Sequence, residues 1–137
     1  NLLSLLSAID KGLPLPFKCI SSKRSIIHKE NLSSFILACA CTDNAANETF
    51  MISDGTDVSL SEISELFKSS MKSRSLIFCL PIKMIELGLK LTGRSNYIYR
   101  LLHPLQVNTA KANRLVSWKP PLETRKMLRE MATNFSK

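Results

Sequence analysis

Glycine is scarce in this chain of 137 residues, which contains only four. Phosphate-binding loops of the Gly-x-Gly-x-x-Gly and Gly-x-x-x-x-Gly-Lys types need closely spaced glycines, and neither pattern occurs in the sequence. The chain is therefore not expected to cradle a dinucleotide or a triphosphate in either way.

Histidine is also rare, and His28 and His103 lie far apart without a nucleophile motif around either one. A catalytic triad assembled across the fold is an alternative. A hydrogen-bonded structural imidazole at the end of an apolar stretch is the simpler interpretation of His28. Glu62 suits a helix-capping role, so no residue of this chain is predicted to be catalytic.

Long apolar runs are absent as well. The stretch from Leu2 to Ile9 is too short to span a bilayer and is interrupted by Ser4 and Ser7. It also lacks the basic flank and cleavage site of a signal peptide. We therefore expect no membrane span and a cytoplasmic protein.

The four cysteines are few and irregularly spaced. Cys19, Cys39, Cys41 and Cys79 lie within apolar segments, and they lack the ligand spacing of a zinc site. Buried free thiols in a reducing compartment are the expected state, with no metal bound.

Acidic residues are outnumbered, 11 against 19 lysines and arginines, which gives a formal net charge of +8. Such a charge favours anionic partners: nucleic acid, anionic lipid or a phosphorylated ligand. Aromatic residues are not interleaved with the basic ones, as they are in a single-strand stacking platform. We predict a phosphate site around Lys18, Lys23 and Arg24, with no nucleic-acid partner. A free-standing basic module that binds nucleic acid or protein is the alternative.

Apolar periodicity predicts several helices separated by short strands. Gly12 and Gly93 should end helices, Asn31 and Asn108 should cap them, and Ser59 with Glu62 forms a capping box. The predicted helices cover residues 2–9, 32–40, 60–67, 82–89, 97–102, a segment after 108, and 122–131. The predicted strands cover residues 13–17, 26–27, 49–53, 76–80 and 105–107. This alternation indicates one α/β domain, or an α+β-like fragment, over residues 1–137.

Several motifs resemble, in their order and spacing, the substrate-binding half of one enzyme family. They are Asn1-Leu2, Leu15-Pro16-Phe17, Arg24 to His28, Ile52-Ser53-Asp54-Gly55, Arg100, Asn108 to Lys111, and Trp118-Lys119-Pro120. The family is the extended short-chain dehydrogenases/reductases, the NAD-dependent nucleotide-sugar epimerases and dehydratases of the UDP-glucose 4-epimerase type. The resemblance covers nearly the whole chain.

The resemblance implies a UDP-sugar substrate and a role for each matching position. Asn1 would hydrogen-bond the diphosphate or the nearby sugar, Arg24 and Arg100 would clamp the diphosphate, and Leu60 would contact the nucleoside. Leu15 and Phe17 would hold the uracil. Apolar walls with backbone donors suit a flat base, and fixed positive charge suits two phosphates.

The resemblance also implies what the chain lacks. In the family, the NAD-binding Rossmann domain and the catalytic Tyr-x-x-x-Lys would lie upstream of residue 1. This chain would then be the C-terminal part of an extended Rossmann-type fold. Alone, it would be inactive and would bind no NAD. Apolar sides around Phe50, Ile52 and Ile77 would then be exposed, with a homodimer as one outcome. The chain departs from the family at Ser25, where Asp is common.

Overall fold

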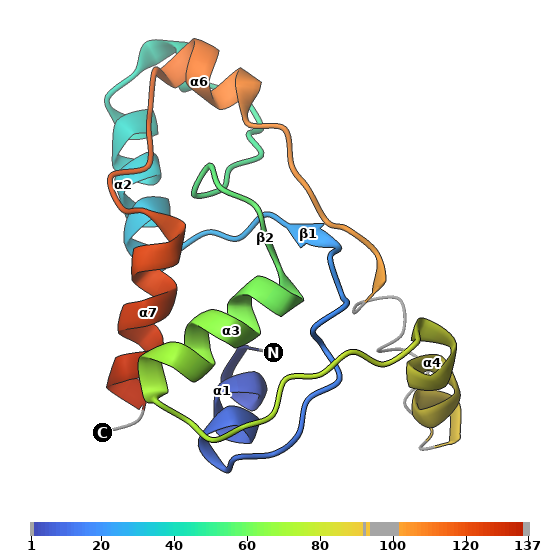
Figure 1. The fold of residues 1–137 in the computed structure, drawn as a ribbon. Coiled ribbons are helices and arrows are strands. Elements are labelled where there is room, and N and C mark those ends of the chain that lie inside the picture. The colour runs from blue at the N-terminus through green and yellow to red at the C-terminus, as the bar shows by residue number, and fades with distance from the viewer. Residues whose placement is uncertain (1, 92, 94–101, 136–137) are drawn as a thin grey trace.

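Helices make up most of the structure, a computed structural model that describes residues 2–91, 93 and 102–135 (Figure 1). The α-helices are α1 (Leu2–Asp10), α2 (Lys29–Ala40), α3 (Leu60–Met71), α4 (Ile82–Leu91), α6 (Ala110–Val116) and α7 (Thr124–Phe135). A 3-10 turn, η1 (Asp43–Ala45), follows α2. The strands are β1 (Lys23–Arg24) and β2 (Val58–Ser59).

The helix ends follow local signals in the sequence. The Ser59 side chain accepts a hydrogen bond from the Glu62 N–H, and the Glu62 carboxylate accepts one from the Ser59 N–H, so the predicted capping box is confirmed. Beyond the last turns of α1 and α4, Gly12 and Gly93 both have a φ of +68°, a conformation that glycine adopts without steric cost. The Asn108 side chain accepts from the Ala110 N–H at 2.9 Å, although Thr109 is the capping residue by position.

Helices α1, α3 and α7 share the larger of two apolar clusters, the main core. It also takes in Leu15 from the segment after α1 and Val58 from β2, and Phe67 of α3 lies fully buried within it. The buried members are Leu5, Leu6, Ile9, Leu15, Val58, Ile63, Phe67, Leu128 and Ala132. The first and last helices of the described chain are therefore parts of one core.

A second core forms around three residues from distant segments. Phe35 of α2 packs edge-on against Trp118 at 5.1 Å between ring centroids, and Ala112 of α6 completes the buried set. Phe50 adds a second edge-on contact with Phe35 at 5.5 Å. The indole N–H of Trp118 donates to the Ser34 hydroxyl at 3.1 Å, which satisfies the polar end of the buried ring.

The strands are fewer and shorter than predicted. β1 pairs antiparallel with β2, with Lys23 opposite Ser59 and Arg24 opposite Val58, so the strand expected at 26–27 lies earlier in the chain. The segments around Leu15, Ile77 and Leu105 contribute isolated bridges only, and residues 49–53 form no strand. The mixture of helix and strand is compatible with the predicted α/β class, while a Rossmann-type sheet stays a prediction.

Asn31 does not cap α2, contrary to prediction. His28 is the cap, and its ring nitrogen accepts from the Glu30 N–H at 3.3 Å. Asn31 is fully buried in the first turn, where its amide donates to the Asp54 carboxylate at 2.7 Å and to the Leu122 carbonyl at 2.9 Å. The Oδ1 oxygen of the same side chain accepts from the Leu122 N–H at 3.0 Å, so Asn31 ties three distant segments together.

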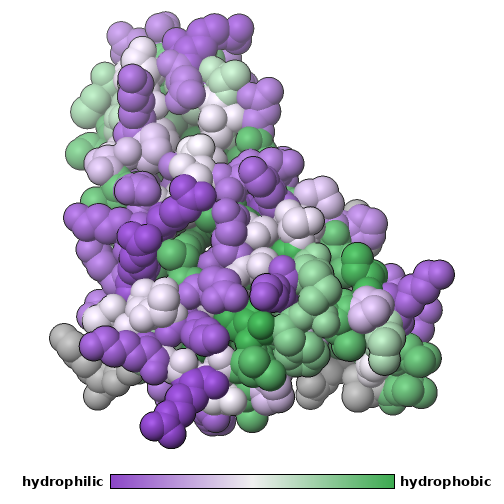
Figure 2. Space-filling view, in the orientation of Figure 1, coloured by the Kyte–Doolittle hydropathy of each residue, from purple (hydrophilic) through white to green (hydrophobic). Residues whose placement is uncertain are grey.

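The exposed apolar surface also differs from the prediction. Phe50 and Ile52 are half-buried against the second core, and Ile77 is only 6% exposed. Exposed apolar side chains gather instead on α4 and the segment before it, where Figure 2 shows a hydrophobic surface at the lower right. They are Leu76, Ile82, Met84, Leu87 and Leu91.

Candidate functional site

The segment predicted to hold a base, residues 13–17, begins a strap that covers residues 13–20 and runs beside residues 76–79. The Leu15 N–H donates to the Leu76 carbonyl at 2.8 Å, and the Phe78 N–H donates to the Leu15 carbonyl at 3.0 Å. Further along, the Lys18 N–H donates to the Phe78 carbonyl at 3.1 Å. Pro14 and Pro16 have no N–H, which explains why the pairing is limited to these few bonds.

This pairing changes what Leu15 and Phe17 offer to a ligand. Leu15 is 8% exposed within the main core, and both of its backbone polar groups are already bonded within the protein. Phe17 is half-buried, with its ring packed at the edge of the main core. Of the two residues, Phe17 is the more accessible for contact with a flat base.

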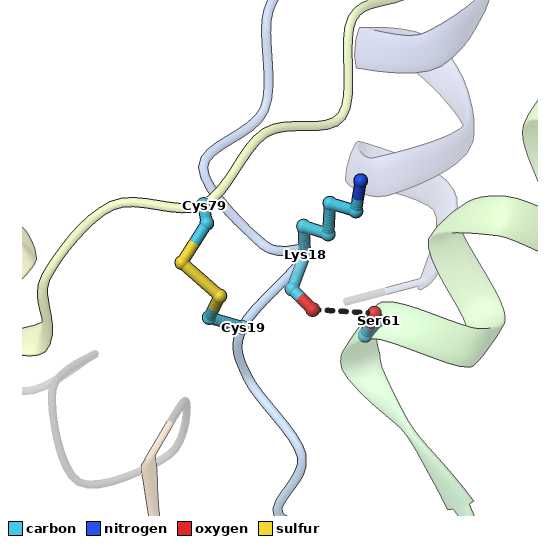
Figure 3. Close-up of a disulfide and its surroundings, with 4 residues drawn as sticks. All are labelled: Lys18, Cys19, Ser61 and Cys79. Atoms are coloured by element: carbon cyan, nitrogen blue, oxygen red, sulfur yellow. Dashed lines mark hydrogen bonds between the residues drawn. A yellow bond between two sulfur atoms is a disulfide. The ribbon is translucent and has the colours of Figure 1, made fainter.

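The strap is fixed at its far end by hydrogen bonds from Ser61 and by a disulfide (Figure 3). The Ser61 hydroxyl donates to the Lys18 carbonyl at 2.9 Å, and the Ser61 N–H donates to the Ile20 carbonyl at 3.3 Å. Beside them, Cys19 forms a disulfide with Cys79. The strap is therefore held from α3 on one side and from residues 76–79 on the other.

The disulfide corrects the expectation of four buried free thiols. Phe17 pairs with Cys79, so the extended backbones run side by side and bring the Cα atoms of Cys19 and Cys79 to 5.1 Å. That separation lies in the usual disulfide range. Cys39 and Cys41 are free, but Cys39 is half-buried and Cys41 is exposed. Spacing in the sequence gave no sign of a pair separated by 60 residues.

Arg24 lies where three segments meet: β1, β2 and the stretch after residue 102. We call this place the Arg24 junction. Backbone bonds join Ser25 to Leu105 at 2.8 Å and Leu105 to Lys23 at 3.0 Å, and Arg24 bridges to Leu105. One guanidinium nitrogen of Arg24 lies 3.4 Å from the His103 carbonyl, at the exposed surface. The remaining donors of the guanidinium fork can reach an anion from this position.

The carboxylate of Asp57, which was not predicted as a site residue, lies close to Arg24 in the fold. The Ser25 hydroxyl donates to one oxygen of Asp57 at 2.6 Å, and Gln106 donates to the other at 2.6 Å. The same hydroxyl accepts from the Val107 N–H at 3.0 Å. The hydrogen bonds from Ser25 and Gln106, together with the charge of Lys23, lower the pKa of Asp57 below its ordinary value.

The Asp57 carboxylate lies beside Ser25, the position at which the sequence departs from the family it resembles. Ser25 holds a negative charge from Asp57 where an acidic side chain of its own is absent. Asp57 is ionised at neutral pH, because even the ordinary pKa of 3.8 lies far below 7 and the pKa of Asp57 is lowered further. A bound phosphate would be repelled from the side of Asp57, so the free face of Arg24 is the side that suits an anion.

The other predicted site residues lie at different distances from this junction. Leu60 begins α3 directly after β2, and its half-buried side chain packs against the main core. Because Ser59 pairs with Lys23, the β1–β2 pair brings Leu60 close in the fold to Arg24. Asn1 and Arg100 lie outside the described residues, so their predicted contacts with the diphosphate stay predictions.

Two shallow grooves lie away from this junction. One runs between α3 and α7 and is lined by Glu62, Glu65, Arg125 and Arg129. In it, Arg125 forms an exposed ion pair with Glu62 at 3.4 Å. In the part of the chain that the structure describes, no three metal-ligating side chains converge, and no helix is long and apolar enough to cross a membrane.

Comparison with known proteins confirms the resemblance to an epimerase. The chain is 34% identical to a UDP-glucose 4-epimerase of Vibrio cholerae over 136 residues. The match covers 98% of this chain and 42% of the epimerase, so the chain spans less than half the length of the relative. No family model matches the sequence, and no solved structure matches it.

Proposed function

We propose that this chain is the nucleotide-sugar-binding part of an NAD-dependent epimerase or dehydratase that acts on a UDP-sugar. The observation that carries the proposal is the similarity to an epimerase along 98% of the chain. In the intact protein, transient oxidation of a sugar carbon by NAD would precede return of the hydride. The part described here would bind and orient the nucleotide end of that substrate.

The distribution of positive charge supports a diphosphate ligand. Arg24 presents a planar fork of donors at the surface, and Lys23 is exposed beside it on the same strand. Lys18 is exposed on the strap next to Phe17. An arginine fork binds two phosphate oxygens at once, and the aromatic ring of Phe17 offers an apolar wall for a base.

The placement of the glycines supports the proposal that this part of the protein does not hold NAD. A dinucleotide site needs glycines between a strand and the helix that follows it. Gly12 and Gly93 instead follow helices, Gly88 lies within α4, and Gly55 precedes β2. NAD and the catalytic tyrosine would therefore be supplied by an NAD-binding domain beyond this chain, and the chain alone would be inactive.

Three further properties belong to the same proposal. The exposed apolar side chains on α4 would contact that domain or a second copy of the protein in a homodimer. A cytoplasmic location suits an enzyme of nucleotide-sugar metabolism. The Cys19–Cys79 disulfide would then be an exception to the reducing conditions of that compartment.

The test is UDP-sugar binding to the intact protein with substitutions at Arg24. Arg24→Ala should weaken binding by roughly 1.5–3 kcal/mol, the range for a hydrogen bond to a charged group. Arg24→Lys should recover part of the loss, because an ammonium cannot make the bidentate contact. NAD affinity should stay unchanged in both variants. Isothermal titration calorimetry at low and moderate salt measures each dissociation constant.

Arg129→Ala is the matched control, since it removes one exposed arginine from α7 and leaves the Arg24 junction intact. It should bind UDP-sugar as tightly as the parent. Equal affinity of parent and Arg24→Ala would contradict the site assignment. Tight, salt-dependent binding of nucleic acid without UDP-sugar binding would favour the alternative of a basic binding module.

A further inference from the structure

The Cys19–Cys79 disulfide lies at the surface, at the point where two weakly held segments meet. Both cysteines are exposed, and they are 60 residues apart in the sequence. Cys19 is at the end of the strap, whereas Cys79 comes three residues before the start of α4. The bond therefore joins the strap to the segment that leads into α4 (Figure 3).

We propose that Cys19–Cys79 is a thiol–disulfide exchange site whose redox state sets how firmly the strap and α4 are held. A dithiol would reduce the bond, and the disulfide form of such a dithiol would re-form it. A thiolate of the dithiol attacks one sulfur, which forms a mixed disulfide and releases the other cysteine as a thiolate. The second thiol of the reductant then attacks the mixed disulfide and releases the remaining cysteine. Two electrons and two protons pass to the cysteine pair, and the dithiol becomes a disulfide.

Access to the sulfurs supports exchange. Thiol–disulfide exchange needs an open approach to one sulfur of the bond. Structural disulfides typically resist reduction by the glutathione pool, whereas exposed ones are more easily reduced and include the labile and regulatory disulfides. Both half-cystines here are exposed, so a reductant can approach without unfolding of the main core.

The surrounding backbone makes the exchange reversible. The Lys18–Phe78 hydrogen bond at 3.1 Å and the Leu15–Phe78 bond at 3.0 Å do not depend on the sulfurs. Burial of Ile20 and Ile77, 3% and 6% exposed, also holds the two segments after reduction. The reduced thiols would therefore stay near one another, ready to re-form the bond.

Reduction would loosen α4 more than any other helix. Ile85 is the only buried residue among the ten described in α4, whereas α1 and α3 each bury three residues. Without the disulfide, residues 76–81 would connect α4 to the rest of the protein through the few backbone hydrogen bonds to the strap and through the buried side chain of Ile77. Local opening is expected where few apolar contacts hold a segment, so the strap and α4 should open together.

Hydrogen exchange on the intact protein tests the proposal, with dithiothreitol as the reductant. Millimolar dithiothreitol should make Cys19 and Cys79 alkylatable under native conditions, as measured by peptide mass spectrometry. Amide exchange should rise at least tenfold in peptides covering residues 13–20 and 76–91, while peptides of α3 keep their rates. Addition of oxidised dithiothreitol should restore the slow rates.

Two variants control the experiment. Cys19→Ser combined with Cys79→Ser should exchange like the reduced parent and should not respond to dithiothreitol. Cys41→Ser, which removes an exposed free thiol, should respond like the parent. A disulfide that resists reduction until the whole protein unfolds, or reduction that leaves exchange rates unchanged, would overturn the proposal. UDP binding measured on the same samples tests the proposed function separately, because the exchange result does not depend on it.

Discussion

Replacing Asn31 by alanine should destabilise the chain more than any surface substitution, because it breaks a buried network between distant segments. The substitution removes one hydrogen bond to the Asp54 carboxylate and two to the backbone of Leu122. The first is worth roughly 1.5–3 kcal/mol and each of the others roughly 0.5–1.5 kcal/mol. Since the three bonds share one side chain and are coupled, we expect a loss of about 3–4 kcal/mol in the free energy of unfolding.

Urea unfolding of the chain, followed by circular dichroism, measures this loss through the midpoint and slope of the transition. Ser33→Ala is the control, because Ser33 lies on the same helix and its hydroxyl donates to the Lys29 carbonyl at the exposed surface. The control should change stability by less than about 0.5 kcal/mol.

A second substitution separates the hydrogen bonds from the packing. Asn31→Asp keeps the shape of the side chain but turns a carboxylate oxygen toward Asp54 across the 2.7 Å contact. The two carboxylates would repel each other at neutral pH, and acid should relieve the destabilisation as one of them takes up a proton. A loss below about 1 kcal/mol for Asn31→Ala, or a pH-independent effect of Asn31→Asp, would refute the assignment of this network as a structural junction.

Three other perturbations test separate parts of the fold. Because the pKa of Asp57 is lowered, its contribution to the free energy of unfolding should be constant above pH ~5 and should shrink as the pH falls below 3.8, the ordinary pKa of an aspartate. The difference in free energy of unfolding between the parent and Asp57→Asn, measured against pH, should therefore narrow in that acid range. Ser59→Ala removes half of the capping box and should cost about 1 kcal/mol in urea unfolding, and an unchanged midpoint would contradict the cap. Phe67→Ala in the main core should lower the free energy of unfolding by about 3–5 kcal/mol, whereas Leu91→Ala at the exposed end of α4 should lower it by less than about 0.5 kcal/mol. Similar losses in the two variants would argue against the described burial of Phe67 and exposure of Leu91.

Helices could be predicted from this sequence because their signals are local. The 3.6-residue periodicity, the Ser59–Glu62 capping box and the glycines after α1 and α4 all act within a few residues of the chain. Strands could not, because an apolar run such as 49–53 becomes a strand only where a partner runs beside it. In the structure, Phe50 packs against Phe35 instead.

The candidate site was predictable to a similar extent. Motif order predicts Arg24 at the head of a strand, whereas in the structure Arg24 is the last residue of β1. The Asp57 carboxylate beside it comes from a different segment and depends on tertiary contact. The disulfide depends on the alignment of the strap with residues 76–79, which sequence spacing does not encode. The residue type of Asn31 predicts a helix cap, whereas burial and distant partners decide its role in the structure.

The sharing of the main core between α1 and α7 has a consequence for synthesis on the ribosome. Leu6 and Ile9 are made before most of the residues they pack against, and the core to which they belong is complete only when Leu128 and Ala132 have been added. At 5–20 residues per second, the interval from residue 9 to residue 132 lasts roughly 6–25 s. Throughout that time α1 exposes an apolar face, which makes the nascent chain a natural client for chaperones that bind hydrophobic segments.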